Sequence, residues 1–136
     1  MLQPKRTKYR KYQKGRIGGI RSNTDHLQFG EFGIKALDTV RIPAKTIEAL
    51  RRVITRKLKR TGQIWVRIFP DIVVTAKPSE VRMGKGKGAP SYWVCRVQKG
   101  QILFELNGIP LSLAQQAAKL VSYKLPIPTK FISYYN

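Results

Sequence analysis

Residues 43–62 read PAKTIEALRRVITRKLKRTG, and this stretch predicts the long amphipathic helix around which the chain folds. The apolar residues that recur at helical spacing are Ile47, Leu50, Ile54 and Leu58. Pro43 suits the first helical position, because its fixed φ matches a helix start, and Gly62 ends the pattern. We therefore expect a helix with one face packed on a core.

The other face of this predicted helix is strongly cationic. It carries Lys45, Arg51, Arg52, Arg56, Lys57, Lys59 and Arg60. Only Glu48 opposes them, whereas a solvated helix face ordinarily mixes signs to gain pairs three or four residues apart. A membrane-surface helix would add a wide apolar face rich in Trp, Phe and Leu, which this helix lacks. We predict a contact with nucleic-acid phosphates, made by Arg51, Arg52, Arg56, Lys59 and Arg60.

Strand patterns flank the helix. Residues 27–40 carry apolar side chains spaced mainly by twos, broken around Gly30 and Gly33, which predicts two short strands or one bulged strand. After the helix, residues 63–69 and 72–74 are rich in β-branched and aromatic side chains and predict two further strands.

The C-terminal half predicts more strands and a second helix. Residues 92–97 and 102–106 predict a hairpin with Lys99 and Gly100 at its turn. Leu113, Ala117, Leu120 and Val121 mark the helix, capped by Ser112 and ended before Pro126, and Phe131, Ile132, Tyr134 and Tyr135 predict a closing strand. The fold class is therefore α+β, a mostly antiparallel sheet with two packed helices.

Residues 1–24 are predicted to form an extended basic RNA-binding arm, separate from a single globular domain at residues 25–136. Before Asp25 the basic residues are Lys5, Arg6, Lys8, Arg10, Lys11, Lys14, Arg16 and Arg21, with no acid among them. Glycines and the lack of apolar periodicity argue against a helix. Tyr9 and Tyr12 are interleaved with the charges and offer flat faces for unpaired bases. A solvated, flexible tail is the alternative.

Residues 82–90, RMGKGKGAP, predict a Gly/Lys-rich insertion loop in the globular domain. Glycine lets a backbone approach another surface closely, while Lys and Arg reach phosphates. The predicted RNA contacts are Arg82, Met83, Gly84, Lys85, Gly86, Lys87 and Gly88. Gly84, Gly86 and Ala89 also match a dinucleotide-binding spacing, but Pro90 and a strand pattern follow where that motif needs a helix.

Composition narrows the class of partner. Among 136 residues, 27 Lys and Arg face 7 Asp and Glu, a net charge of +20, so we expect a polyanionic partner, nucleic acid or an anionic membrane. No apolar run approaches the roughly 18 to 20 residues that cross a bilayer, and the N-terminus lacks the apolar region of a secretory signal. Cys95 and His26 are single and the acids are scattered, so we expect no disulfide, metal, cofactor or enzymatic site. Cys95 itself is expected to be a small buried thiol.

Two motifs carry a family resemblance. Residues 82–88, RMGKGKG, and residues 63–71, QIWVRIFPD, resemble the two signatures of bacterial-type large ribosomal subunit protein 16. The similarity begins at residues 2–8, LQPKRTK, and covers nearly the whole chain. Two positions depart from the family pattern: Val73 stands where many relatives have proline, and Pro128 stands where a basic residue is common.

The resemblance implies a structural constituent of the large ribosomal subunit that binds ribosomal RNA near the aminoacyl-tRNA accommodation region. It further implies transient tRNA contact and neighbouring ribosomal proteins, but no membrane and no small-molecule substrate. Residues 11–16 and 99–105 are more similar to organelle-encoded mitochondrial members, with a bacterial cytoplasm or a plastid as alternatives. A free-standing basic nucleic-acid-binding protein is the other candidate function, while an RNA-modifying enzyme would need a cofactor motif or acid/base pair that we do not find.

Overall fold

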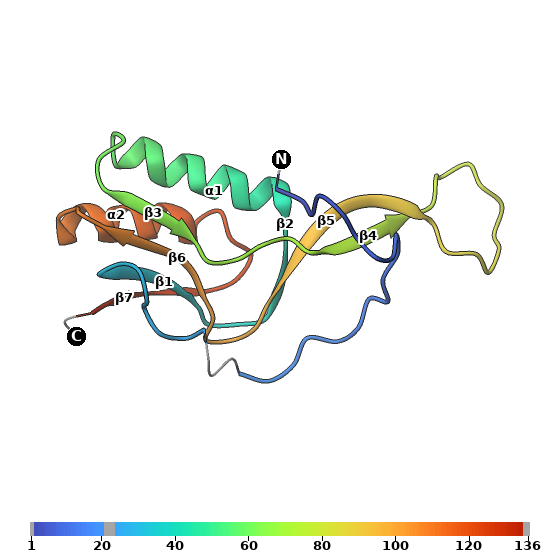
Figure 1. Cartoon of the computed structure of the whole chain (residues 1–136), viewed down its shortest axis with the longest axis horizontal. Helices are drawn as coiled ribbons and strands as arrows, with labels where there is room; N and C mark the ends of the chain where they lie inside the picture. The colour runs from blue at the N-terminus through green and yellow to red at the C-terminus, as the bar shows by residue number, and fades with distance from the viewer. Residues whose placement is uncertain (1, 21–23, 135–136) are drawn as a thin grey trace.

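The computed structural model describes residues 2–20 and 24–134, so the predicted arm residue Arg21 and strand residue Tyr135 lie outside the described residues (Figure 1). The elements are β1 (Phe32–Ala36), β2 (Val40–Pro43), α1 (Ala44–Lys57), β3 (Gln63–Val66), β4 (Ile72–Ala76), β5 (Ala89–Val97), β6 (Ile102–Asn107), α2 (Leu111–Ser122) and β7 (Thr129–Ser133). The predicted α+β class is confirmed.

The strands form two antiparallel sheets rather than one. The four-stranded sheet has the order β3-β6-β1-β7, and the three-stranded sheet has the order β2-β5-β4. The chain crosses from the four-stranded to the three-stranded sheet twice, between β1 and β2 and again between β3 and β4. It returns through α1 to β3 the first time and directly from β5 to β6 the second time. The three-stranded sheet extends away from the helices and ends in the loop at residues 77–88 (Figure 1).

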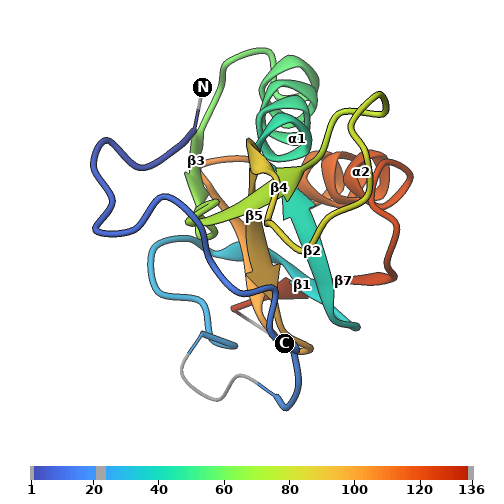
Figure 2. The ribbon, with the colours of Figure 1, turned by 90° about the vertical axis from the view of Figure 1, so that its right-hand side faces the viewer.

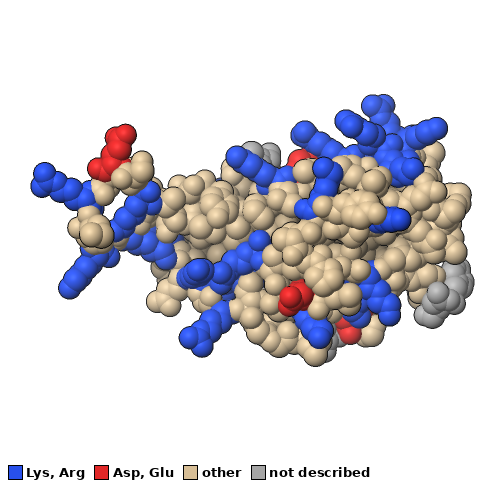
Figure 3. Space-filling view, turned by 180° about the vertical axis from the view of Figure 1, so that it is seen from behind, with Lys and Arg blue, Asp and Glu red and all other residues tan. Residues whose placement is uncertain are grey.

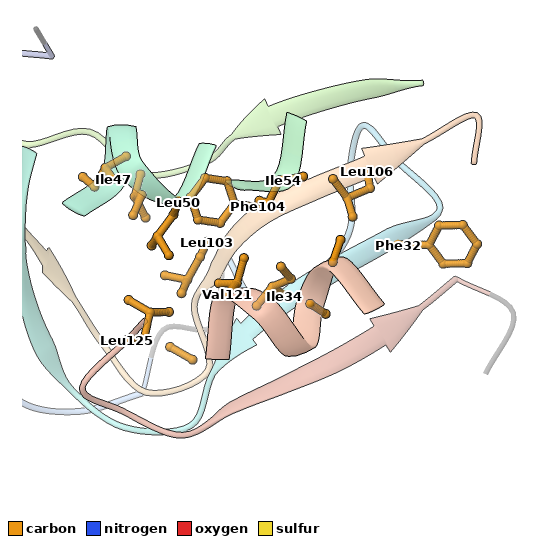
Figure 4. Packing of buried hydrophobic residues seen from close by; sticks show 14 of the residues in the cluster. Phe32, Ile34, Ile47, Leu50, Ile54, Leu103, Phe104, Leu106, Val121 and Leu125 are labelled. Carbon is orange, nitrogen blue, oxygen red and sulfur yellow. The ribbon is translucent and has the colours of Figure 1, made fainter. Parts of the chain in front are cut away.

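The core lies between the helices and the four-stranded sheet. Helices α1 and α2 contact each other and pack on strands of that sheet, and apolar side chains from α1, α2, β1 and β6 point into a shared interior (Figure 4). The predicted apolar face of α1 is confirmed, because Ile47, Leu50 and Ile54 are fully buried. Cys95 is buried in β5, as expected. No helix in the described ranges is both long and apolar enough to cross a membrane.

The predicted hairpin between residues 92–97 and 102–106 is wrong. Strand β5 pairs with β2 and β4, whereas β6 pairs with β1 and β3. The turn itself is present, since Gly100 has a φ of +90°, but it is fastened to the end of β1. The Gly100 amide donates to the Ala36 carbonyl at 2.8 Å, and the Ala36 amide donates to the Gln101 carbonyl at 2.9 Å. These bonds direct the two strands into different sheets.

The helix ends differ from the predicted ones. Pro43 is the last residue of β2 and the extended N-cap of α1, with ψ of 149°, so the first helical residue is Ala44. Helix α2 likewise begins at Leu111 after an extended proline, and Ser112 therefore lies in its first turn and does not cap it. Both helices therefore have a proline as N-cap residue. Because a proline side chain carries no hydrogen-bond acceptor, both helices start without a side-chain cap.

Candidate RNA interface

The cationic ridge predicted on the first helix lies along the outer face of α1. Arg51, Arg52, Thr55, Arg56, Lys59 and Arg60 line a shallow depression of about 560 Å³. Figure 3 shows Lys and Arg side chains gathered over this end of the molecule. The structure thus brings together all five ridge residues that the sequence singled out, although Lys59 and Arg60 follow α1 rather than belong to it.

Glu48 fixes two of these arginines. Arg51 donates through Nε and Nη2 to the two carboxylate oxygens at 2.9 and 2.7 Å, and Arg52 Nε donates to Glu48 Oε1 at 3.0 Å. The hydrogen bond from Arg51 is the largest cause that lowers the pKa of Glu48 to about 2, with Arg52 adding to it against some desolvation. Among the described residues, Arg56 forms no ion pair, so its charge is left for a partner.

The C-terminal end of the ridge is held in an unusual backbone conformation. Helix α1 stops at Lys57 with Leu58 as its C-cap, five residues before the predicted breaker Gly62. Lys59 and Arg60 have φ angles of 51° and 64°, in the left-handed region that favours glycine. Two exposed cations therefore occupy strained positions that would suit glycine better, which is common at functional surfaces.

The N-terminal arm crosses the outer face of the three-stranded sheet, where two arginines fasten it. Arg41 of β2 lies directly opposite Arg96 of β5. Arg41 Nη2 donates to the carbonyls of Lys14 and Gly15 at 3.2 and 2.7 Å, and Arg96 Nη2 donates to the carbonyl of Lys14 at 2.8 Å. The arm is held through its backbone, so its own cationic side chains stay exposed.

The arm also contacts helix α1 and the loop. At its start, Leu2 packs against the core and lies beside the first half of α1. Further along, Lys11 Nζ donates to the Lys87 carbonyl at 3.1 Å, and Lys87 Nζ donates to the Tyr12 carbonyl. Figures 1 and 2 show the arm beginning beside the N-terminal end of α1 and running past β5 and β4 before it turns back. The arm therefore contacts both α1 and the loop, and all three segments carry exposed cations.

The loop at residues 77–88 projects from the hairpin of β4 and β5 and is exposed over almost its whole length. Gly84 and Gly86 have no positive φ, and a Cβ added at either would have no neighbour within 4 Å, so nothing within the described residues requires glycine at these two positions. Gly88 is different, because a Cβ would lie 2.4 Å from the Ala76 carbonyl oxygen. Glycine is required by the chain's own packing only at that third position.

A buried ion pair that sequence patterns did not predict fastens the segment before β1 to the four-stranded sheet. Glu105 is fully buried in β6, and its carboxylate accepts hydrogen bonds from Arg67 Nη1 and from the amides of Phe29 and Gly30, the last two at 2.7 and 2.8 Å. Burial alone would raise the pKa of Glu105, but these donors and the Gln28 amide outweigh it and lower that pKa. A glutamate inside an otherwise apolar strand was the signal in the sequence.

The described residues hold no group of three or more His, Cys, Asp or Glu side chains that could bind a metal ion. Their ion pairs are His26–Asp25, Arg51–Glu48, Arg52–Glu48 and Arg67–Glu105. Most cations of the arm, ridge and loop therefore have no acidic partner within the described ranges. Such a surface attracts a polyanion, and arginine and lysine suit phosphate oxygens.

Known proteins resemble this chain over nearly its whole length. A relative from Prototheca wickerhamii, large ribosomal subunit protein uL16m, is 64% identical over 134 residues, 98% of this chain and 99% of the relative. Large ribosomal subunit protein uL16 of Azorhizobium caulinodans is 58% identical over 132 residues, 97% of this chain and 96% of its own length. The profile of the family described as ribosomal protein L16p/L10e matches residues 4–132. The chain therefore belongs to the ribosomal protein L16p/L10e family.

Proposed function

We propose that the chain is a structural constituent of the large ribosomal subunit and that it binds ribosomal RNA through the arm, ridge and loop. The observation that carries this proposal is that Arg56, Lys59 and the exposed arm cations lack acidic partners among the described residues. A net charge of +20 on a small domain is stabilised by a polyanion that covers it. Because the chain belongs to a ribosomal protein family, ribosomal RNA is the polyanion that we propose.

The ribosome in question is the mitochondrial one. Support comes from the uL16m relative at 64% identity, while bacterial relatives at 58% show that the chain is of the bacterial type. Its partners are accordingly large-subunit ribosomal RNA and the ribosomal proteins that surround it.

A finer placement is part of the proposal. We infer that the chain lies near the region where aminoacyl-tRNA is accommodated, with transient contact to tRNA, and that the loop from Arg82 to Gly88 enters RNA there. Support comes from the exposed, projecting geometry of this loop and from its acid-free sequence between Arg82 and Gly88. The chain's role is to bind and position RNA, and its family is a structural rather than an enzymatic one.

Sedimentation tests the main proposal. Organelles are fractionated, ribosomes are washed in high salt, and subunits are separated on a sucrose gradient with an antibody against the chain as readout. We expect the chain to co-sediment with large subunits and to leave them only when the RNA is digested. Recovery at the top of the gradient, together with binding to duplex DNA, would instead favour a free-standing nucleic-acid-binding protein.

A mutant series tests the finer placement. Subunits reconstituted with Lys85→Ala plus Lys87→Ala are compared with wild type for occupancy and for peptide synthesis across a salt series. Because fewer phosphate contacts release fewer counterions, we expect a defect that deepens with salt. Peptide synthesis equal to wild type at full occupancy would contradict a role of the loop near tRNA.

A further inference from the structure

We propose that the hollow between the N-terminal arm and the three-stranded sheet receives one unpaired RNA nucleobase together with its adjoining phosphates. The proposal rests on the RNA-binding function proposed above and deepens it, because it assigns base stacking to one place on an otherwise electrostatic surface. The hollow has a volume of about 420 Å³, within the roughly 300 to 1,000 Å³ that small-molecule sites occupy.

The floor of the hollow is an apolar patch created by strand register. Val94 of β5 lies opposite Pro43 on one side and opposite Ile72 on the other, so these three side chains share one face of the sheet. The next cross-strand pair on that face joins Val74 to Tyr92. All five residues line the hollow. A flat, weakly polar ring fits such a floor better than a hydrated ion does.

The arm supplies an aromatic wall. Tyr12 lines the hollow from the arm side and is half-buried there. Its backbone position is fixed, since its carbonyl accepts a hydrogen bond from Lys87, and the arm just beyond it is held by Arg41. An aromatic ring held in place stacks on any base, which gives affinity without sequence preference.

Cations surround this apolar interior. Lys14, Arg41 and Lys87 line the hollow, and no lining residue is acidic. The hydrogen bonds that Arg41 and Lys87 donate go to backbone carbonyls of the arm, which are neutral and leave both positive charges uncompensated. An apolar floor, an aromatic wall and a cationic rim together match a nucleotide: the base enters, and the phosphates on either side meet the rim.

The test uses the full chain and three probes. The first is a fluorescein-labelled single-stranded RNA decamer of mixed sequence, the second is the same ribose-phosphate decamer without bases, and the third is unlabelled AMP as competitor. Binding is followed by fluorescence anisotropy at two salt concentrations. We expect the wild type to bind the decamer more tightly than its abasic counterpart, and AMP to compete only weakly.

Two variants separate stacking from charge. Tyr12→Ala should weaken decamer binding roughly 5- to 150-fold, the loss expected for one stacked base, while abasic binding changes less than about twofold. Val74→Lys adds a cation at the floor, so a purely electrostatic surface would bind more tightly, whereas a filled hollow loses the preference for bases. Tyr123→Ala, an exposed tyrosine after α2, is the matched control and should leave both affinities unchanged. Circular dichroism checks that each variant is folded.

The outcomes separate the two proposals. If Tyr12→Ala and Val74→Lys keep the wild-type preference for bases while binding remains salt-sensitive, the hollow is not a base receptor and RNA binding stands. If wild type binds neither decamer, both proposals fail. If AMP competes more strongly than the decamer itself, the ligand is a free nucleotide and the assignment to RNA is overturned.

Discussion

Replacing Glu105 with alanine removes the single carboxylate on which two segments of the chain converge. Its oxygens accept from the amides of residues 28–30 and from Arg67, and Glu105 is fully buried. The loop before β1 is attached to the four-stranded sheet through these bonds. In the variant, the guanidinium and the amides lose a charged acceptor at a site closed to water.

The magnitude follows from the burial of the pair. Breaking a buried ion pair by removing one partner costs about 3 to 5 kcal/mol, because the other charge is left uncompensated. That is a large part of the roughly 5 to 15 kcal/mol that stabilise an ordinary domain. Arg67 also donates to the His26 carbonyl at 2.9 Å and lies over the ring of Phe29, so part of its stabilisation survives and the lower half of the range is expected.

Urea unfolding, followed by tryptophan fluorescence and circular dichroism, measures this loss. Trp65 stacks on Phe29 with ring centroids 6.0 Å apart, so its emission reports the loop that Glu105 holds. The control is the double variant Glu105→Leu with Arg67→Met, which should be more stable than Glu105→Leu alone because no charge remains buried. A loss below about 1 kcal/mol in Glu105→Ala, or a double variant less stable than Glu105→Leu alone, would refute the reasoning.

The same carboxylate predicts how stability depends on pH. The folded pKa of Glu105 is lowered below its unfolded value, which is near 4.3. Its contribution is therefore complete above that unfolded value and is lost as the pH falls through the folded pKa. Glu105→Gln should unfold at lower urea concentration than wild type at pH 7, and the difference between the two midpoints should shrink as the pH falls below that unfolded value. Midpoints that stay equally far apart down to pH 2 would contradict this assignment.

Three further predictions follow from the surface. Arg56→Ala should weaken RNA binding more than Arg51→Ala, whose guanidinium already serves Glu48, and equal losses in filter binding would contradict this. Lys59→Gly should raise the free energy of unfolding by roughly 1 kcal/mol, since it relieves a φ of 51°, while it weakens RNA binding; lower stability would contradict the strain. Gly88→Val should destabilise the fold by about 1 to 3 kcal/mol through contact with a strand carbonyl, whereas Gly86→Val should unfold like wild type, and the reverse order in urea would exclude this account.

Features that depend only on residues close together in the sequence were predicted well from local patterns. The face of α1 follows from the spacing of Ile47, Leu50 and Ile54, and all three are buried because helical periodicity places them on one side. The basic arm, the Gly/Lys-rich loop and the ridge could also be predicted, because a run of charged residues can be recognised without knowledge of tertiary contacts. For the same reason the α+β class could be predicted from the order of helical and strand patterns.

Strand pairing could not be predicted in the same way. A short turn at Gly100 favours a hairpin, but the buried runs on either side gain more from partners distant in sequence. Because the predicted hairpin paired β5 with the wrong strand, the sequence did not indicate that Arg41 lies opposite Arg96. These two arginines become neighbours only through the pairing of β5 with β2. The path of the arm, and the hollow beneath it, depend on that pair and were therefore out of reach of sequence patterns.

The hydrogen bonds that hold the arm leave the positive charge of the chain uncompensated. Arg41, Arg96 and Lys87 bind arm carbonyls, which satisfies hydrogen bonds yet neutralises no charge. Glu48 and Glu105, by contrast, use their carboxylates to orient or bury arginines inside the protein. Two of the seven acids are thus paired with arginines inside the protein, while the exposed cations of the arm have no such partner among the described residues. A polyanion that covers this surface adds the compensation that the chain itself lacks, so arm, ridge and loop should gain protection from hydrogen exchange together when RNA binds.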